Sequence, residues 1–328
     1  MVSHEKPNIF MDYLSAFRPD HWIKNTFILI GVAAAYFVGI SFSVSDVIVD
    51  VIIVFILTNL AAFTNYGINE ILDCKKDKQH PVKHNRALPS GRISKFSVLA
   101  GCFALYVIIL SLGYHLVNFW VYLSIISLLF MGILYNVPPI RLKEHAYVDV
   151  LSESLNNPIR FFIGWFAVQD TYIPPISFVV SFWLFGAFLM AGKRFAEYRF
   201  IGDPKLAASY RKSFLHYNED RLLILMIVCA TGFLYLLGVI SLKYDISVLV
   251  FTPLIMLFLG WYFYLTLQED SVVKEPERLF KKKEFIIFSI FFFVIIILVA
   301  KYDFPFLKLL NNKRLLRIEQ FSTLKFFH

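Results

Sequence analysis

Nine long apolar stretches dominate this chain and restrict the folds open to it. Each is long enough for a helix to cross about 30 Å of hydrocarbon, where every backbone N–H and C=O must find its partner inside the protein. Such stretches predict transmembrane α-helices. They lie near residues 23–43, 46–68, 96–116, 118–136, 147–168, 174–192, 222–242, 246–267 and 284–301.

The composition agrees with a membrane-embedded chain. Of the 328 residues, 58% are hydrophobic and only 17% are charged, which is unlike a soluble domain. We therefore expect an all-α integral membrane protein with about nine transmembrane helices, formed by one polytopic domain over residues 1–303. The three cysteines, Cys74, Cys102 and Cys229, lack the spacing of a disulfide framework or a metal site.

Lys and Arg are concentrated in alternate connections between the apolar stretches. Most of them lie in the N-terminal segment and in segments 69–95, 137–145, 193–221 and 269–284. By the positive-inside rule, we expect the N-terminus and these loops to face the cytoplasm of the cell (inner) membrane.

The C-terminal segment 304–328 is predicted to be a basic amphipathic tail. An odd number of spans would place it outside the cell despite its charge. The alternatives are that it lies along the headgroup surface or that the number of spans differs by one.

A dense polar block, N-E-I-L-D-C-K-K-D-K-Q-H-P-V-K-H-N-R, starts at Asn69. Asn69, Asp73 and Asp77 recur every fourth residue, so they share one face if the preceding helix continues. Mg²⁺ prefers oxygen ligands and commonly binds through one or two carboxylates plus phosphate oxygens. The block therefore indicates a site for a metal and a diphosphate at the membrane surface. The alternative is a solvated loop whose charges only fix the topology.

A second polar cluster extends from Tyr135 to Arg160. Asp149, Glu153 and Asn157 again step by four, and Arg160 follows Asp149 by about three helical turns, so these side chains share a face. Charged groups at membrane depth usually face the interior of a helix bundle or an aqueous cavity. A purely structural ion pair involving Glu153 is the alternative to a functional site.

The two clusters together resemble those of the UbiA-type intramembrane prenyltransferase superfamily. N-E-x-x-D-x-x-x-D followed by H-P-x-K-x-x-R is similar to the first signature of that superfamily, and Asp149 with Glu153 resembles its second aspartate region. The resemblance spans nearly the whole chain. It implies an all-α helical bundle around a central cavity that has a polar cap on the cytoplasmic side.

Within the superfamily, the closer resemblance is to the phosphoribosyltransferases that act on decaprenyl phosphate. It is carried by R-P-D-H-W-I-K-N from Arg18, A-G-K-R-F-A-E from Ala191, S-Y-R-K-S from Ser209 and E-P-E from Glu275, in addition to the two acidic clusters. This branch implies transfer of 5-phosphoribose from phosphoribosyl pyrophosphate to a polyprenyl phosphate. The release of pyrophosphate would depend on Mg²⁺.

The resemblance also implies roles for individual residues. Asn69, Asp73, Asp77 and Asp149 are the expected Mg²⁺ ligands, and the three aspartates are the expected catalytic residues. The expected substrate-binding residues are Lys24, Asn69, Lys83, Arg86, Tyr135, Lys143, Glu153, Arg160, Lys193 and Arg194. The expected partners are the two substrates and the lipid bilayer, with no nucleic acid. The sequence does not determine the oligomeric state.

Two other functions remain open from the sequence. A polyprenyl diphosphate could bind the same metal and alkylate an aromatic or other acceptor. In that case the Lys and Arg residues near 193 and 211 would only set the topology of the chain in the membrane. A transporter or lipid flippase would use the polar residues to line a passage. The chain lacks the paired halves and matching broken helices that transporters often display.

Overall fold

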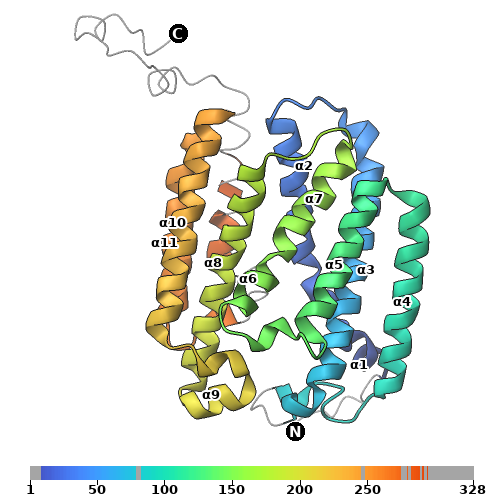
Figure 1. Cartoon of the computed structure of the whole chain (residues 1–328), viewed down its shortest axis with the longest axis vertical. Coiled ribbons are helices and arrows are strands. Elements are labelled where there is room, and N and C mark those ends of the chain that lie inside the picture. The colour runs from blue at the N-terminus through green and yellow to red at the C-terminus, as the bar shows by residue number, and fades with distance from the viewer. Residues whose placement is uncertain are drawn as a thin grey trace, which may run out of the picture.

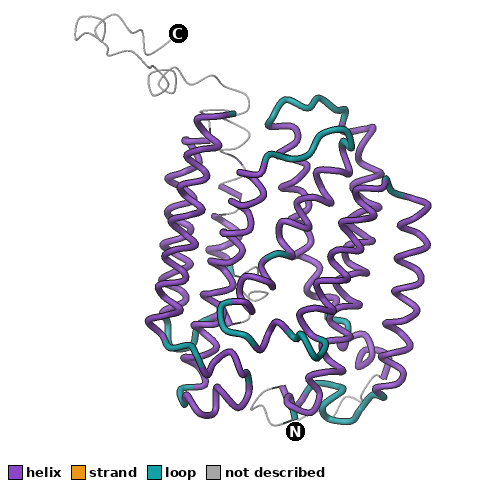
Figure 2. The backbone as a smooth tube through the Cα atoms, in the orientation of Figure 1, coloured by secondary structure: helices purple, strands orange, loops and turns teal. Residues whose placement is uncertain are grey.

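The computed structural model describes residues 9–78, 83–244 and 248–274, together with residues 279, 282–288, 290, 291 and 294. Every regular element in these residues is a helix, and the described part contains no strand (Figure 2). The all-α prediction is therefore confirmed. The predicted boundary at residue 303 and the predicted tail over 304–328 lie outside the described residues.

Six described helices are long and apolar enough to cross a membrane. Large apolar side chains such as Phe103 and Leu257 point outward from them, as expected of helices that contact lipid. These helices are α3 (Val44–Asp77), α4 (Lys95–Leu116), α5 (Phe119–Asn136), α8 (Ile176–Ile201), α10 (Glu219–Lys243) and α11 (Val248–Leu267). The chain is thus an integral membrane protein.

Shorter elements fill the remaining space. The α-helices among them are α1 (Ile9–Ala16), α2 (Ile28–Phe37), α6 (Val148–Ser154), α7 (Asn156–Val168) and α9 (Pro204–Tyr210). The 3₁₀ turns are η1 (Pro19–Phe27), η2 (Lys83–Asn85), η3 (Leu142–Glu144), η4 (Lys212–Leu215) and η5 (Val272–Lys274).

Two predicted spans are divided in the structure. The stretch 23–43 contains the end of η1 and the ten-residue α2, and the stretch 147–168 is split into α6 and α7. Pro158 explains the second division, because it has no amide hydrogen to donate to the carbonyl of Ser154. The predicted span 284–301 lies largely outside the described residues, so the number of nine helices remains a prediction.

The helices form two groups with α6 between them (Figure 1). In one group, Ile28 of α2, Val54 of α3 and Trp165 of α7 belong to a continuous buried core. In the other group, α8 packs on α10 and α11, and its core includes Phe188 and Met226. The two apolar cores lie within the two helix groups, so polar side chains can occupy the space between the groups.

α2 and α7 approach each other closely because glycines occupy their contact. A Cβ built on Gly164 would lie 1.8 Å from the carbonyl oxygen of Ile28, and one built on Gly31 would lie 2.1 Å from the carbonyl oxygen of Phe161. Only glycine leaves room for these backbones to touch. This close packing fixes α7, which carries Arg160.

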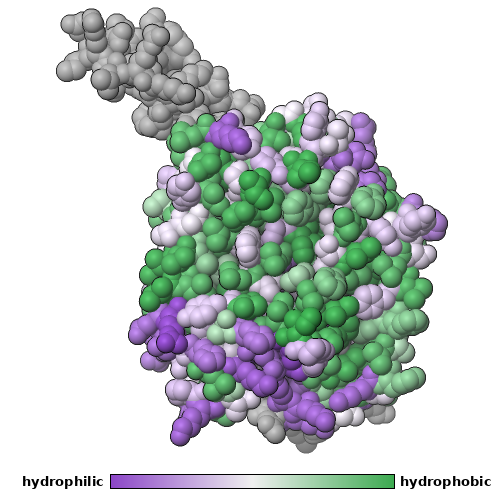
Figure 3. Space-filling model, viewed as in Figure 1, coloured by the Kyte–Doolittle hydropathy of each residue, from purple (hydrophilic) through white to green (hydrophobic). Residues whose placement is uncertain are grey.

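Polar residues gather at one end of the molecule. In Figure 3, hydrophilic surface is concentrated at the end that carries α1 and α9, whereas the flanks of the helices are largely hydrophobic. The basic segments around residues 83–95, 137–145 and 203–218 all lie at this end. The prediction that these loops share one side of the bundle is therefore supported, although which side of the membrane they face stays a prediction.

Replacing Gly164 by alanine should destabilise the protein, because the new methyl group must displace the backbone of α2. We expect a loss of about 1–3 kcal/mol. Thermal unfolding of the purified protein in detergent would measure it. Gly238→Ala in α10 is the matched control, since its Cβ meets nothing within 4 Å. Equal melting temperatures for the two variants would contradict the tight α2–α7 contact.

Candidate active site

A cavity of about 1220 Å³ opens between the two helix groups. Its polar part is lined from α3, α6, α8 and α9, and an apolar part is lined by Phe185, Leu189 and Phe258. Such a volume exceeds that of most ligand pockets and suits a large amphipathic substrate. The predicted residues that line it are Lys24, Asn69, Asp73, Asp77, Lys83, Arg86, Tyr135, Lys143, Glu153, Arg160, Lys193 and Arg194.

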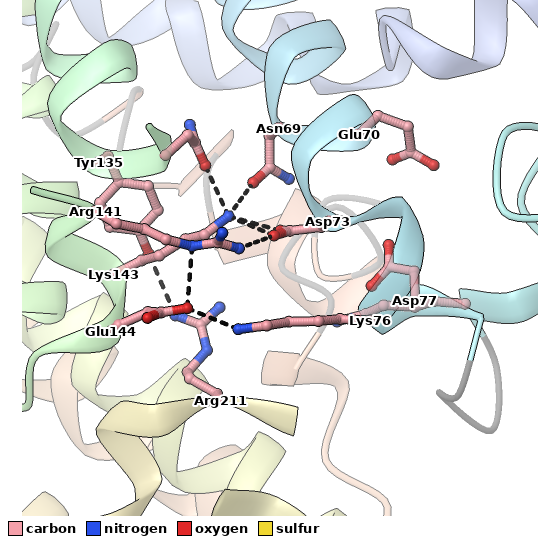
Figure 4. A network of polar contacts seen from close by, with 12 residues as sticks. Asn69, Glu70, Asp73, Lys76, Asp77, Tyr135, Arg141, Lys143, Glu144 and Arg211 are labelled. Atoms are coloured by element: carbon pink, nitrogen blue, oxygen red, sulfur yellow. Dashed lines mark hydrogen bonds and ion pairs between the residues drawn. The ribbon is translucent and has the colours of Figure 1, made fainter. Parts of the chain in front are cut away.

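The first acidic block lies on a helix, because α3 continues without a break to Asp77. Asn69 and Asp73 share one face of α3, as their spacing predicts. Both contact the same partner, the ammonium group of Lys143, and Figure 4 shows these side chains pointing toward one another. Asp77 turns to a different partner, Arg86, whose Nη1 donates to Asp77 Oδ2 at 2.8 Å.

Lys143 occupies the centre of an oxygen cage. Its Nζ donates to Asp73 Oδ1 and Oδ2 at 2.8 and 2.7 Å, to Asn69 Oδ1 at 2.8 Å and to Asn136 Oδ1 at 3.0 Å. Burial lowers the pKa of Lys143 to about 8, although the carboxylate of Asp73 acts in the opposite direction. Four oxygen atoms thus converge on one cationic nitrogen, which is an arrangement suited to a hard cation.

Glu144 connects this cage to neighbouring cations. It accepts a hydrogen bond from Lys76 at 2.7 Å, and it forms ion pairs with Arg141 at 3.1 Å and Lys212 at 3.1 Å. Arg141 in turn donates to Asp73 Oδ1 at 2.7 Å (Figure 4). Burial opposes ionisation of Glu144, but the hydrogen bonds from Lys76 and Lys212 outweigh it and lower the pKa to about 2. Glu144 therefore stays ionised and holds the cations in place.

A separate ion-pair cluster involves the other side of α3. Glu70 is only 3% exposed, and it accepts from Arg18 Nη2 at 2.8 Å and from Arg86 Nη1 at 3.4 Å. Arg18 adopts a left-handed backbone conformation with φ of 49° immediately before Pro19. These contacts tie the segment before α2 to the end of α3.

The second acidic cluster is organised around Arg194 of α8. Arg194 Nε donates to Asp149 Oδ2 at 3.0 Å, Nη2 donates to Glu153 Oε2 at 2.7 Å, and Nη1 donates to Glu197 Oε2 at 3.2 Å. Tyr135 also donates to Glu153 Oε2, at 2.5 Å. The sequence grouped Asp149 and Glu153 with Asn157 and Arg160, whereas in the structure the guanidinium of Arg194 joins the two carboxylates.

Asp149 differs from the other predicted site residues because it does not line the cavity. It is fully buried and also accepts hydrogen bonds from Tyr217 at 2.7 Å and Ser213 at 3.1 Å. Within the described residues, no three His, Cys, Asp or Glu side chains are grouped so that they could hold a metal ion. The prediction that Asn69, Asp73, Asp77 and Asp149 hold one Mg²⁺ requires these side chains to meet. The structure does not bring Asp149 together with Asp73 and Asp77.

The wall opposite Asp73 carries further cations. Lys83 contacts Glu197 at 3.4 Å and donates a hydrogen bond to Tyr210. Arg211 reaches Tyr135 at 3.4 Å and lies 3.7 Å from Asp149. This wall thus presents Lys83 and Arg211 close to the Arg194 cluster.

Several cavity residues were not predicted as site residues. Glu197 and Arg211 lie within the A-G-K-R-F-A-E and S-Y-R-K-S motifs, so the motifs carried a signal for them. Arg18 and Glu70 likewise lie within recognised motifs. Asn136 lies within the second polar cluster, but it falls outside the four-residue step of Asp149, Glu153 and Asn157.

Comparison with known proteins identifies the family. A model of the UbiA prenyltransferase family matches residues 26–293. Decaprenyl-phosphate phosphoribosyltransferase from Mycolicibacterium smegmatis is 27% identical over 241 residues, which cover 73% of this chain and 72% of that protein. The protein of the same name from Mycobacterium tuberculosis is 27% identical over 246 residues, which cover 75% of this chain and 78% of that protein.

The fold has solved counterparts. A UbiA homolog from Archaeoglobus fulgidus, bound to DMAPP and Mg²⁺, aligns with a TM-score of 0.66 at 19% identity and covers 89% of this chain and 100% of that chain. This likeness shows the fold, and the family match agrees with the resemblance inferred from the sequence motifs. The chain is a membrane transferase that belongs to the UbiA prenyltransferase family.

Proposed function

We propose that this protein transfers 5-phosphoribose from phosphoribosyl pyrophosphate to a polyprenyl phosphate and releases pyrophosphate. The lipid-linked pentose would serve the synthesis of a cell-envelope glycan. The names of the relatives from Mycolicibacterium smegmatis and Mycobacterium tuberculosis support this choice of reaction.

The observation that carries the proposal is that several cations gather at the polar part of the cavity. Lys143 and Arg141 contact Asp73, Lys83 and Arg194 contact Glu197, and Arg211 lines a small pocket with Asp73 and lies 3.7 Å from Asp149. Phosphoribosyl pyrophosphate has two anionic ends, a diphosphate on C1 and a phosphate on C5, so it requires two cationic regions. The apolar part of the cavity suits the polyprenyl chain of the acceptor.

The oxygen cage around Lys143 fits a divalent cation. Asn69, Asp73 and Asn136 place oxygen atoms within 3.0 Å of one point, where the ammonium stands in for a hard cation. Asn69 and Asp73 would hold Mg²⁺ there, with Asp77 one helical turn further along α3. When bound, Mg²⁺ would neutralise charge on the diphosphate leaving group. The Mg²⁺ bound to the Archaeoglobus fulgidus homolog supports the use of a divalent cation.

The chain itself would act mainly by binding and positioning. An oxygen of the lipid phosphate forms a bond to C1 of the ribose while the bond from C1 to the pyrophosphate oxygen breaks, and pyrophosphate leaves with both bonding electrons. The attacking oxygen is already anionic, so no general base is needed. Arg141 and Arg211 would stabilise developing charge, and the enclosed cavity would exclude water that could hydrolyse the donor.

We propose that the polar end of the molecule faces the cytoplasm of the inner membrane. The basic loops gather at this end, and loops rich in Lys and Arg preferentially stay on the cytoplasmic side. Phosphoribosyl pyrophosphate, a highly charged soluble donor, would then reach the cavity directly from the cytoplasm.

A second candidate function is alkylation of an aromatic or other acceptor by a polyprenyl diphosphate. DMAPP bound to the homolog from Archaeoglobus fulgidus favours it. Purified protein should be offered radiolabelled phosphoribosyl pyrophosphate with polyprenyl phosphate, and separately polyprenyl diphosphate with aromatic acids. We expect a phosphoribosylated lipid only in the first mixture, lost with a chelator and restored by Mg²⁺. A prenylated product only in the second mixture would favour the alternative.

Replacing Asp73 by asparagine should reduce transfer by about 100-fold or more, because it removes the charge that faces Lys143 and the bound cation. The variant should still insert into the membrane. Lipid-product formation in purified samples would measure the effect. Asp46→Asn is the matched control, since Asp46 lies exposed in the first turn of α3. Full turnover by Asp73→Asn would argue strongly against this site.

Replacing Lys143 by alanine should tighten binding of a divalent cation by roughly tenfold, because the ammonium and the metal compete for the same oxygen atoms. Electron paramagnetic resonance of Mn²⁺ titrated into the purified protein would measure the affinity. Lys212→Ala is the control, as it removes a nearby charge that contacts Glu144 and not the cage. Unchanged or weaker Mn²⁺ binding in Lys143→Ala would show that the cage is not the metal site.

A further inference from the structure

Arg160 of α7 is held rigidly inside the cavity. Its side chain is 7% exposed, and its Nε donates to Asn25 Oδ1 at 2.7 Å. Asn25 Nδ2 donates to Asn59 Oδ1 at 2.9 Å, and Asn59 Nδ2 donates to the carbonyl oxygen of Phe55 at 2.8 Å. This chain of amides joins η1, α3 and α7 and fixes the orientation of the guanidinium.

The guanidinium of Arg160 has no carboxylate partner among the described residues. Within the described residues, its single hydrogen bond uses Nε and leaves Nη1 and Nη2 without an acceptor, while the residue lines the cavity. The other arginines of the site are paired: Arg18 with Glu70, Arg86 with Asp77, Arg141 with Asp73, and Arg194 with Asp149 and Glu153. Arg160 is therefore a buried charge that forms no direct ion pair with a described carboxylate.

Such a charge is costly unless something neutralises it. Arginine is never deprotonated in proteins under ordinary conditions, and removing its charge from water without a counterion carries a large penalty. A neutral amide such as Asn25 satisfies one N–H group but does not supply negative charge. The two free Nη groups form a planar fork that matches the oxygens of a phosphate.

The position of Arg160 separates it from the oxygen cage. No hydrogen bond or ion pair in the described structure joins Arg160 to Lys143, Asp73 or Arg141. Asn156 and Asn157, three to four residues earlier on α7, also line the cavity and share its face. The carboxylate of Glu153 also lines the cavity here, but it pairs with Arg194 and not with Arg160, so the guanidinium of Arg160 stays available to an anion.

We propose that Arg160, oriented by Asn25, binds the terminal phosphate monoester of a substrate at a site distinct from the diphosphate site around Lys143. This inference rests on the proposed function, in which both substrates carry such a group: the 5-phosphate of the donor and the phosphate of the lipid acceptor. A prenyltransferase that uses only a prenyl diphosphate has no need of a second anion site. Arg160 would thus help select phosphoribosyl transfer over prenyl transfer.

The test is equilibrium binding of three probes to purified full-length protein by calorimetry. The probes are ribose 5-phosphate, a short-chain prenyl monophosphate, and inorganic pyrophosphate with Mg²⁺. Arg160→Gln should weaken the binding of one of the two monophosphates by about tenfold or more, because a charge-assisted bidentate contact is lost. Binding of pyrophosphate should stay within about twofold of wild type, a change of only about 0.4 kcal/mol.

The affected probe identifies the source of the phosphate. Weaker ribose 5-phosphate binding, with a raised KM for phosphoribosyl pyrophosphate, assigns Arg160 to the donor. Weaker prenyl monophosphate binding, with a raised KM for the lipid, assigns it to the acceptor. The proposal would be overturned if Arg160→Gln bound both monophosphates with wild-type affinity. It would also be overturned if the variant lost as much affinity for pyrophosphate as for a monophosphate.

Two further variants separate binding from structural effects. Arg160→Lys keeps the charge and should retain more affinity for the monophosphate than Arg160→Gln does, whereas equal losses would indicate a structural role and overturn the proposal. Arg199→Gln is the matched control, because Arg199 pairs with Glu219 and does not line the cavity. It should bind all probes as wild type does.

The same measurements distinguish the two proposals from each other. Arg160-dependent monophosphate binding in a wild-type protein that transfers no phosphoribose would overturn the proposed function and support the anion site. Phosphoribosyl transfer by the wild-type protein, with monophosphate binding that does not depend on Arg160, would overturn the anion site alone.

Discussion

Pairing of buried charges across the cavity is the constraint on which this architecture depends. Arg194 of α8 binds Asp149 and Glu153 of α6, and Lys143 of η3 binds Asp73 of α3. Removing Asp149 would leave part of the charge of the fully buried Arg194 uncompensated in a medium of low dielectric constant, which is strongly destabilising. The pairs therefore fix α6 and η3 against the long helices while keeping charged groups at the place where anionic substrates would bind.

This charge balance also bears on how phosphates would be accommodated. Most cavity cations already have carboxylate partners, so a donor carrying several phosphate charges would add negative charge that the protein alone does not neutralise. Under the proposed function, a divalent cation near Asp73 and the unpaired guanidinium of Arg160 would restore the balance. Asp149 and Glu153 would then serve chiefly to position Arg194 before the substrate arrives, whereas Asp73 would hold the cation.

Local spacing predicted part of the site well. The four-residue step from Asn69 to Asp73 placed both side chains on one face because α3 continues through the polar block. The same reasoning grouped Asp149 with Glu153, since both lie on α6. It did not predict that Asp149 would be buried by contacts with Arg194 and Tyr217, because these contacts depend on how α6 packs against elements more than forty residues away along the chain.

The sequence by itself determined the membrane-embedded helical class, the family and the cluster of basic loops at one end, because apolar length, motif spacing and charge asymmetry are local properties of the chain. Tertiary structure alone decided which charges meet. The oxygen cage around Lys143 needs Asn136 from α5 and Asp73 from α3. Arg160 has no ion pair among the described residues, and the carboxylate of Glu153 binds Arg194 instead. Such contacts arise from packing between helices, where distance in space is independent of distance along the chain.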